Sequence, residues 1–170
     1  MFNKIVSVIA LGAAALSPSL VFGADDARSS IHIEATIPNK QFHVQPRDPE
    51  FGKNEYMYYD PMTYRFTSLR HIYDVKNTDG SVHAYIENAF STGAIYLSNG
   101  VDHVALRAVF NGVPLDNRPQ EVVDDATSTP GTQAEMLIVV ANSPTRPLSP
   151  GVYNADFTVI FDAVPRVAAL

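Results

Sequence analysis

Two β-rich runs joined by a tight turn occupy residues 69–87, whose sequence is LRHIYDVKNTDGSVHAYIE. Residues 69–75 and 81–87 are rich in β-branched and aromatic side chains, which favour strands. The connecting residues 76–80 are Lys-Asn-Thr-Asp-Gly, and Asn, Asp and Gly tolerate the positive φ angles that a tight turn needs. The stretch therefore predicts a β-hairpin.

Further short strands are predicted after this hairpin. Residues 103–110 lead through Asn111-Gly112 into residues 113–115, which predicts a second hairpin. Residues 134–141 and 152–161 supply two more strands, because β-branched residues dominate them and prolines separate them. Strands spaced by about 8 to 12 residues with turn signals between them indicate an all-β antiparallel sandwich of the immunoglobulin-like kind.

Two regions fit this pattern less well. Residues 46–62 are rich in Pro, Asp and Tyr, and residues 117–132 are polar with two prolines and a glycine. Both are predicted to be surface loops, although residues 121–123 could add a short edge strand.

Composition limits the classes of function. The 170 residues suffice for one domain, and a net charge of −6 with scattered Lys and Arg argues against nucleic acid as a partner. The chain has no cysteine, which excludes disulfides, thiolate catalysis and cysteine-based zinc sites. Stability must therefore come from packing or from a partner.

The N-terminus has the pattern of a cleaved secretory signal peptide. Lys4 precedes an apolar run over residues 5–16, which is shorter than the roughly 20 residues of a membrane span and ends at Ser17-Pro18. We place cleavage after Gly23, with Ala24 as the near alternative, so residues 1–23 are predicted to be removed on export. A buried helix is the alternative for this segment.

The sequence offers little that could carry chemistry. Nucleophile-elbow, phosphate-loop and metalloprotease motifs are missing from it. His71 and His83 could lie near each other across the predicted hairpin, and Asp124, Asp125 and Glu121 form the densest acidic cluster. Solvated surface positions explain both sets more simply, so we predict no catalytic residue, no metal site, no cofactor and no enzymatic activity.

An aromatic cluster near residue 60 could instead form a ligand face. Tyrosine rings supply stacking area with a polar tip, as a carbohydrate-binding surface needs. The alternative is a strand that packs against the core through Met57 and Phe66. The four candidate residues of the ligand face are Tyr56, Tyr58, Tyr59 and Tyr64.

A strictly alternating strand is predicted at the start of the exported chain, over residues 31–37. One face of it would carry Ile31, Ile33, Ala35 and Ile37, and Pro38 follows immediately. Such a strand can pair with its own sheet or be lent to a neighbouring molecule, and the pattern leaves both open.

The sequence IHIEATIP at residues 31–38 resembles the N-terminal donor strand of major pilins of the alternate chaperone-usher class, the colonisation-factor-antigen or alpha-fimbria family. Residues 76–86, 104–115 and 150–160 are similar to the turn and strands that follow in that family, in the same order. The likeness covers most of residues 24–162. The loop at 46–62 is more charged and aromatic than in a shaft pilin, and the tail at 163–170 is longer.

This resemblance implies an incomplete immunoglobulin-like sandwich in residues 39–170, completed by a donor strand from a neighbouring subunit. The donor extension would be residues 24–38. Its side chains Ile31, Ile33, Ala35 and Ile37 would fill successive pockets, and Pro38 would end the lent strand, since proline cannot donate to a β-ladder.

The implied function is that of a structural subunit of a surface fimbria, or pilus, that polymerises by donor-strand complementation and supports cell adhesion. The implied partners are identical or related pilin subunits, a periplasmic chaperone, an outer-membrane usher, a tip adhesin and a host glycan or receptor. The alternative is an exported carbohydrate-binding β-sandwich module that uses the tyrosine face.

Overall fold

Eleven strands and one short helix make up the part of the chain that the computed structural model describes, which is residues 32–35, 40–87 and 89–167. Residues 37–170 form one compact unit, separate from residues 1–36. The predicted signal peptide and residues 24–30 lie outside the described residues. Among the described residues, no helix has the length and apolar character needed to cross a bilayer.

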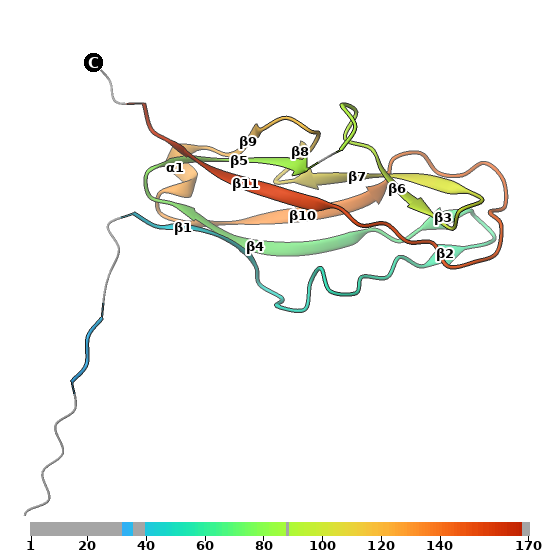
Figure 1. The fold of residues 1–170 in the computed structure, drawn as a ribbon, viewed down its shortest axis with the longest axis horizontal. Helices are drawn as coiled ribbons and strands as arrows, with labels where there is room; N and C mark the ends of the chain where they lie inside the picture. The colour runs from blue at the N-terminus through green and yellow to red at the C-terminus, as the bar shows by residue number, and fades with distance from the viewer. Residues whose placement is uncertain (1–31, 36–39, 88, 168–170) are drawn as a thin grey trace, which may run out of the picture. The chain divides into compact units, whose positions relative to one another are not determined.

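Three antiparallel sheets contain the strands (Figure 1). The large sheet has the order β1 (Phe42–Pro46), β4 (Leu69–Asn77), β10 (Thr132–Val140), β7 (His103–Phe110) and β6 (Ile95–Ser98), and β8 (Val113–Pro114) also pairs with β7. The small sheet has the order β11 (Thr158–Pro165), β5 (Gly80–Glu87) and β9 (Gln120–Val123). A separate two-stranded ribbon joins β2 (Tyr59–Asp60) to β3 (Arg65–Phe66), and α1 spans Asp125–Ser128.

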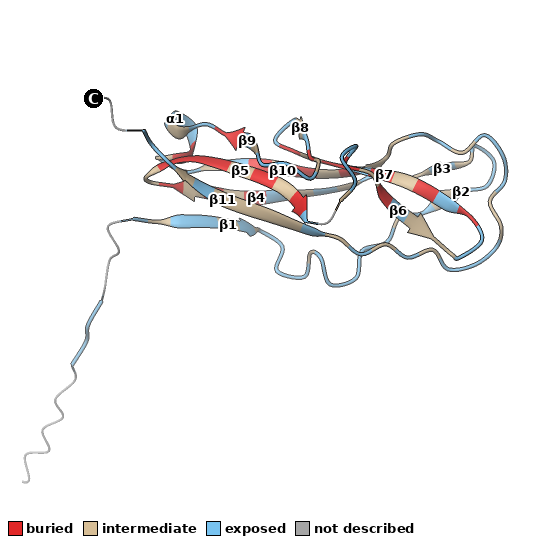
Figure 2. Cartoon of the chain, turned by 45° about the horizontal axis from the view of Figure 1, so that its top comes forward, coloured by how far each residue is buried: buried red, intermediate tan, exposed pale blue. Residues whose placement is uncertain are grey.

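The hydrophobic core lies between the large and the small sheet. Alternate residues of β5 and β7 point into it, and Val82, Ala84 and Phe110 are fully buried there. Figure 2 shows these central strands with buried stretches, whereas β1 and β11 contain no buried residue. This is the inward-outward alternation that sandwich strands require, and it confirms the predicted all-β sandwich.

The prediction of a hairpin at residues 69–87 is wrong in one respect. β4 pairs with β1 and β10, whereas β5 pairs with β11 and β9, so the turn between them carries the chain from one sheet to the other. We call this connection, residues 77–80, the arch. Both of its strands have an apolar inner face, and facing these two sides toward each other buries more apolar surface than a flat hairpin would.

Buried polar groups hold the arch. The Asn77 side chain donates to the Ser81 carbonyl at 2.7 Å and accepts from the Asp79 amide at 3.1 Å. Ser128 of α1 is fully buried, and its hydroxyl donates to the Gly80 carbonyl at 2.5 Å. These bonds satisfy backbone groups that the change of sheet would otherwise leave unpaired, which is costly in the interior.

Most of the other predicted strands are confirmed. β7, β8 and β10 match the predicted residues 103–110, 113–115 and 134–141 closely, and the β7–β8 hairpin turns at Asn111 and Gly112 with positive φ. The suggested edge strand at residues 121–123 is also present, as β9.

The last strand and the two predicted loops need correction. β11 begins at Thr158 and continues to Pro165, later than the predicted 152–161, because its pairing partner β5 extends back to Gly80. Pro165 is tolerated because it lies on an edge strand. The region 46–62 is not wholly a surface loop, since Phe51 and Met57 pack against the core, and region 117–132 contains β9 and α1.

Two strands were not predicted. β1 alternates Phe42, Val44 and Pro46 on one side, and β6 lies between Gly93 and the turn at Asn99-Gly100. β1 has a period-2 pattern and β6 is bounded by turn residues, but both strands are short. A pattern of four or five residues is hard to distinguish from the polar sequence around it.

We predict that Gly80→Ala strongly destabilises the sandwich. Gly80 has φ 156°, and a Cβ there would collide with the carbonyl oxygen of Val164 and the amide of Arg166, both backbone groups of the packed edge strand. We expect a loss of roughly 2 to 4 kcal/mol in the free energy of unfolding, measured by urea denaturation.

The matched control is Gly112→Ala. Its φ is also positive, at 80°, but a Cβ would meet nothing within 4 Å, so only the conformational cost of about 1 kcal/mol remains. Equal losses for the two variants would contradict the close approach of β11 to the arch.

Candidate functional site

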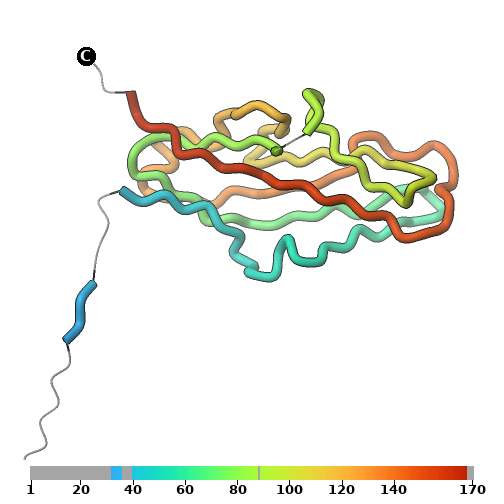
Figure 3. Tube along the Cα trace, in the orientation of Figure 1, coloured from blue at the N-terminus to red at the C-terminus, as the bar shows by residue number. Residues whose placement is uncertain are grey.

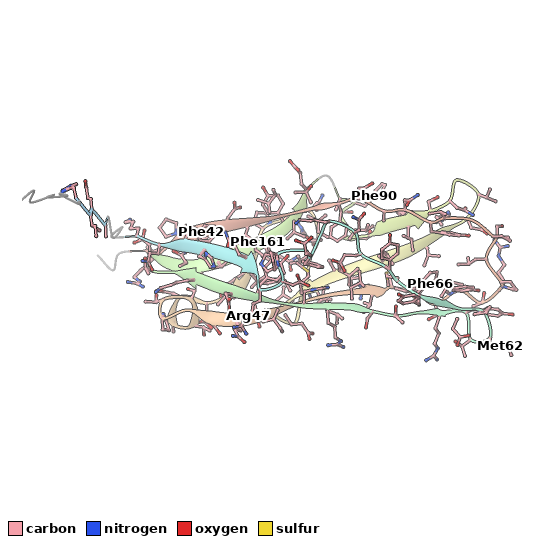
Figure 4. The ribbon with its side chains drawn as sticks, turned by 90° about the horizontal axis from the view of Figure 1, so that it is seen from below. Phe42, Arg47, Met62, Phe66, Phe90 and Phe161 are labelled. Carbon is pink, nitrogen blue, oxygen red and sulfur yellow. The ribbon has the colours of Figure 1, made fainter. Side chains whose placement is uncertain are left out.

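Two strand edges on the same side of the sandwich are open. β1 pairs only with β4, and β11 pairs only with β5, among the strands that the structure describes. Both strands run along one side of the molecule in Figure 1 and Figure 4. Each presents a row of free backbone N–H and C=O groups, which is a template for a further strand.

Inner-face side chains next to these edges are exposed. Phe42 pairs with Asn77 and Ala163 pairs with Val82, and directly paired residues of antiparallel strands share a face, so both point to the core side. Nevertheless Phe42 is 45% exposed and Ala163 is also exposed. The core is therefore unfinished along this side.

The remaining inner-face residues of the two strands are only partly buried. Val44, Val159 and Phe161 pack against the core cluster without being closed off from solvent. We call the two open edges, together with Phe42, Val44, Val159, Phe161 and Ala163, the open seam. An additional apolar strand laid along it would bury all five side chains.

An aromatic cluster forms the base of the open seam. The Phe161 ring lies 4.9 Å from the Phe110 ring in a T-shaped contact and 5.8 Å from the Tyr73 ring. Phe51 adds an edge contact to Tyr73 at 6.0 Å, beyond the end of β1. Burial raises the pKa of Tyr73 to about 12, because the phenolate form is disfavoured away from water.

Hydrogen bonds fix the arch end of both seam strands. Before β1, Gln41 exchanges two bonds with Thr78, its amide donating to Oγ1 at 2.8 Å and its carbonyl accepting from the Thr78 amide at 3.0 Å. After β11, Arg166 donates to both carboxylate oxygens of Asp125, at 2.6 and 2.7 Å. The open edges are thus held in place and are not frayed ends.

Half of the predicted donor strand can be placed. Residues 32–35 belong to no helix or strand and are exposed, and Ile33 is 84% exposed. Ile31, Ile37 and Pro38 lie outside the described residues.

The predicted tyrosine face is only partly exposed. Tyr56 and Tyr58 are 73% and 75% exposed, whereas Tyr59 and Tyr64 are half-buried. The Tyr59 ring packs on Phe66 at 5.0 Å, and its hydroxyl is buried without a hydrogen-bond partner. The Tyr59 ring thus contributes to packing, and only Tyr56 and Tyr58 are largely presented to solvent.

The two histidines of the suggested pair are separated in the structure, and Asp124 of the acidic cluster is engaged in a hydrogen bond. His71 lies on the inner side of β4, stacked on Phe51 at 3.8 Å, whereas His83 belongs to the other sheet, so the suggested pair does not come together. Asp124 caps α1, accepting from the Thr127 amide at 2.8 Å. The described residues contain no group of three or more potential metal ligands.

Sequence reasoning missed the open seam itself. The seam is defined by β1, which contains Phe42, and by the later part of β11, which contains Ala163. No strand was predicted in either place. The alternation Phe42, Val44, Pro46 was the available signal.

The fold is an immunoglobulin-like sandwich with one unfinished side, and a similar fold occurs in a known pilin. The structure is similar to that of the CooA pilin subunit from enterotoxigenic Escherichia coli, with a TM-score of 0.53 and 17% sequence identity over 71% of this chain and 86% of that chain. At this identity the likeness concerns the fold. No curated protein matches the chain by sequence.

The chain belongs to the CS1 type fimbrial major subunit family, whose model matches residues 27–162. It is therefore a structural subunit of a cell-surface fimbria and associates with other pilin subunits. The alternative of a free carbohydrate-binding module is not favoured by this membership.

We predict a strongly acid-shifted carboxyl at the end of the open seam. Hydrogen bonds from Arg166, and then from Thr129, lower the pKa of Asp125 from 3.8 to about 2. Because the folded-state pKa is depressed, this group stabilises the fold above pH 3.8, and the contribution is lost as the pH falls toward 2.

Titration of the Asp125 side-chain carboxyl by NMR tests this. In Arg166→Gln the pKa should rise toward 3.8, whereas Arg118→Gln, which removes the partner of Asp116 instead, should leave it unchanged. An unshifted Asp125 in the unmodified protein would contradict the ion pair.

Proposed function

We propose that the open seam accepts residues 31–37 of a second copy of this chain, and that the fimbria grows by this donor-strand complementation. The observation that carries the proposal is the exposure of inner-face residues Phe42 and Ala163 beside two open strand edges. An alternating strand would supply hydrogen-bond partners for the two open edges and apolar side chains to cover Phe42 and Ala163.

The pattern of the lent strand matches the needs of the seam. Ile31, Ile33, Ala35 and Ile37 share one face of an extended strand, and burying three Ile side chains contributes roughly 1.5 to 3 kcal/mol each before any ladder bond is counted. Pro38 would end the lent strand because it has no N–H to donate. The strand therefore joins two subunits firmly and ends at a defined point.

An unfilled seam also explains which other partners the subunit needs. Free edges beside exposed apolar groups promote aggregation, so a periplasmic chaperone would cover them until an outer-membrane usher assembles the fibre. The signal-like residues 1–23 support passage through the periplasm after cleavage. A tip adhesin and a host glycan or receptor complete the proposed set, and the subunit itself performs no catalysis.

Ile33→Asp tests the donor role. We expect the unmodified subunit to form a detergent-resistant polymer ladder and the variant to fold without forming one, since a carboxylate would have to be buried in an apolar site. The matched control is Glu34→Gln, on the opposite face of the strand, which should polymerise normally. A normal ladder from Ile33→Asp would sink the proposal.

Moving the donor strand within one chain gives a complementary test. A variant with residues 24–38 placed after Leu170 through a flexible linker should be monomeric and melt at a markedly higher temperature, because its own strand fills the seam. The open edges of both seam strands lie on one side of the sandwich, which supports this rearrangement. A stable unmodified monomer that gains nothing from the change would assign residues 31–37 to their own sheet.

A further inference from the structure

Exposed apolar side chains gather at the end of the sandwich opposite the arch. Met62, Val101 and Val152 are 87%, 78% and 78% exposed. They lie in the connections β2–β3, β6–β7 and β10–β11, which all reach this end in Figure 1, and Figure 4 labels Met62 at its tip. We call these three residues the end patch.

Hydrogen bonds hold two of the three loops in place. Asp102, only 9% exposed, accepts from the Ser149 amide at 2.8 Å and from Arg146 at 3.0 Å. Hydrogen bonds from Ser149, and to a smaller extent the charge of Arg146, lower the pKa of Asp102. A bridge between Ser98 and Asn154 ties the same loops again. Val101 and Val152 are therefore exposed on backbone that these bonds hold in place.

The direction of the seam strands indicates where a lent strand would leave. β1 runs toward the end patch and β11 runs away from it (Figure 3). Because β1 and β11 run in opposite directions, a strand laid between them can be antiparallel to only one of them. For pairing with it, β11 has eight residues, whereas β1 has five, one of which is Pro46. Antiparallel pairing is the more stable kind, so the strand should oppose β11 and leave at the end patch.

The connection between the lent strand and its own subunit is short. Gln41 is fixed to Thr78 of the arch on both its amide and its carbonyl, so only residues 38–40 can span the gap. A fully extended chain from residue 37 to residue 41 reaches ~14 Å. The arch of the donating subunit must therefore lie close to the end patch of the receiving one.

We propose that the end patch is the docking surface for the arch end of the next copy of this chain in the fimbria. This inference rests on the proposed donor-strand function and adds a second contact to it. Met62, Val101 and Val152 supply apolar area on one side of the contact. On the opposing surface, Asp79 of the arch pairs with Lys40 at 2.6 Å. The contact fixes the angle between successive subunits, which one strand alone would leave free to rotate.

Cross-linking tests the contact directly, because the chain has no cysteine of its own. The pair Met62→Cys with Lys40→Cys should link neighbouring subunits of an assembled polymer through a short bis-maleimide, giving a covalent ladder in denaturant. The control pair is Phe90→Cys with Lys40→Cys, since Phe90 is 64% exposed but lies away from the end patch (Figure 4). We expect a several-fold higher yield from the first pair.

The possible outcomes separate the two proposals. Equal yields from both pairs in a normal polymer would overturn the docking surface and leave donor-strand complementation intact. Absence of any polymer from the unmodified chain, or a normal polymer from Ile33→Asp, would instead contradict the donor strand. A polymer in which Met62→Cys cross-links to Lys40→Cys no better than the control pair, and whose Met62→Ser variant loses binding to a glycan array, would assign the patch to a glycan and overturn the proposal.

Discussion

The unpaired edges of β1 and β11 are the constraint on which the rest of this structure depends. They face the same side, so the two sheets cannot close over their shared core, and Phe42 and Ala163 stay exposed on what should be an inner surface. A domain of this kind is most stable only when a partner supplies the missing strand. The chain belongs to the CS1 type fimbrial major subunit family, and we propose that this incompleteness serves the assembly of the fimbria.

Hydrogen bonds at the arch stabilise the sandwich although one of its sides is open. Asn77 donates to the Ser81 carbonyl and Ser128 donates to the Gly80 carbonyl where the chain changes sheets, and Arg166 ties the end of β11 to α1. Because both seam strands are fixed at this end by bonds that do not involve the open edges, the edges keep their spacing while empty. Preorganisation of this sort reduces the entropy lost when a strand is added.

The sequence predicted the fold class and the central strands, because β4, β5, β7 and β10 combine strong β-propensity with clear turn signals. It failed where tertiary pairing decides the outcome. The run at 69–87 has a hairpin signature, yet the burial of two apolar faces made it an arch. Likewise β1 is defined by its ladder to β4 more than by its five residues, so the open seam could not be located from the sequence.

Gln41 also has a mechanical consequence. A pull transmitted along the fibre through residues 38–40 would meet the body of the subunit at the doubly bonded pair Gln41 and Thr78, next to the ladder between β1 and β4. Load applied along a strand stretches several ladder bonds together in shear, whereas load across its end would break them one after another. With so little slack between the folded bodies, tension in a fimbria built this way would pass into the folded domain at once.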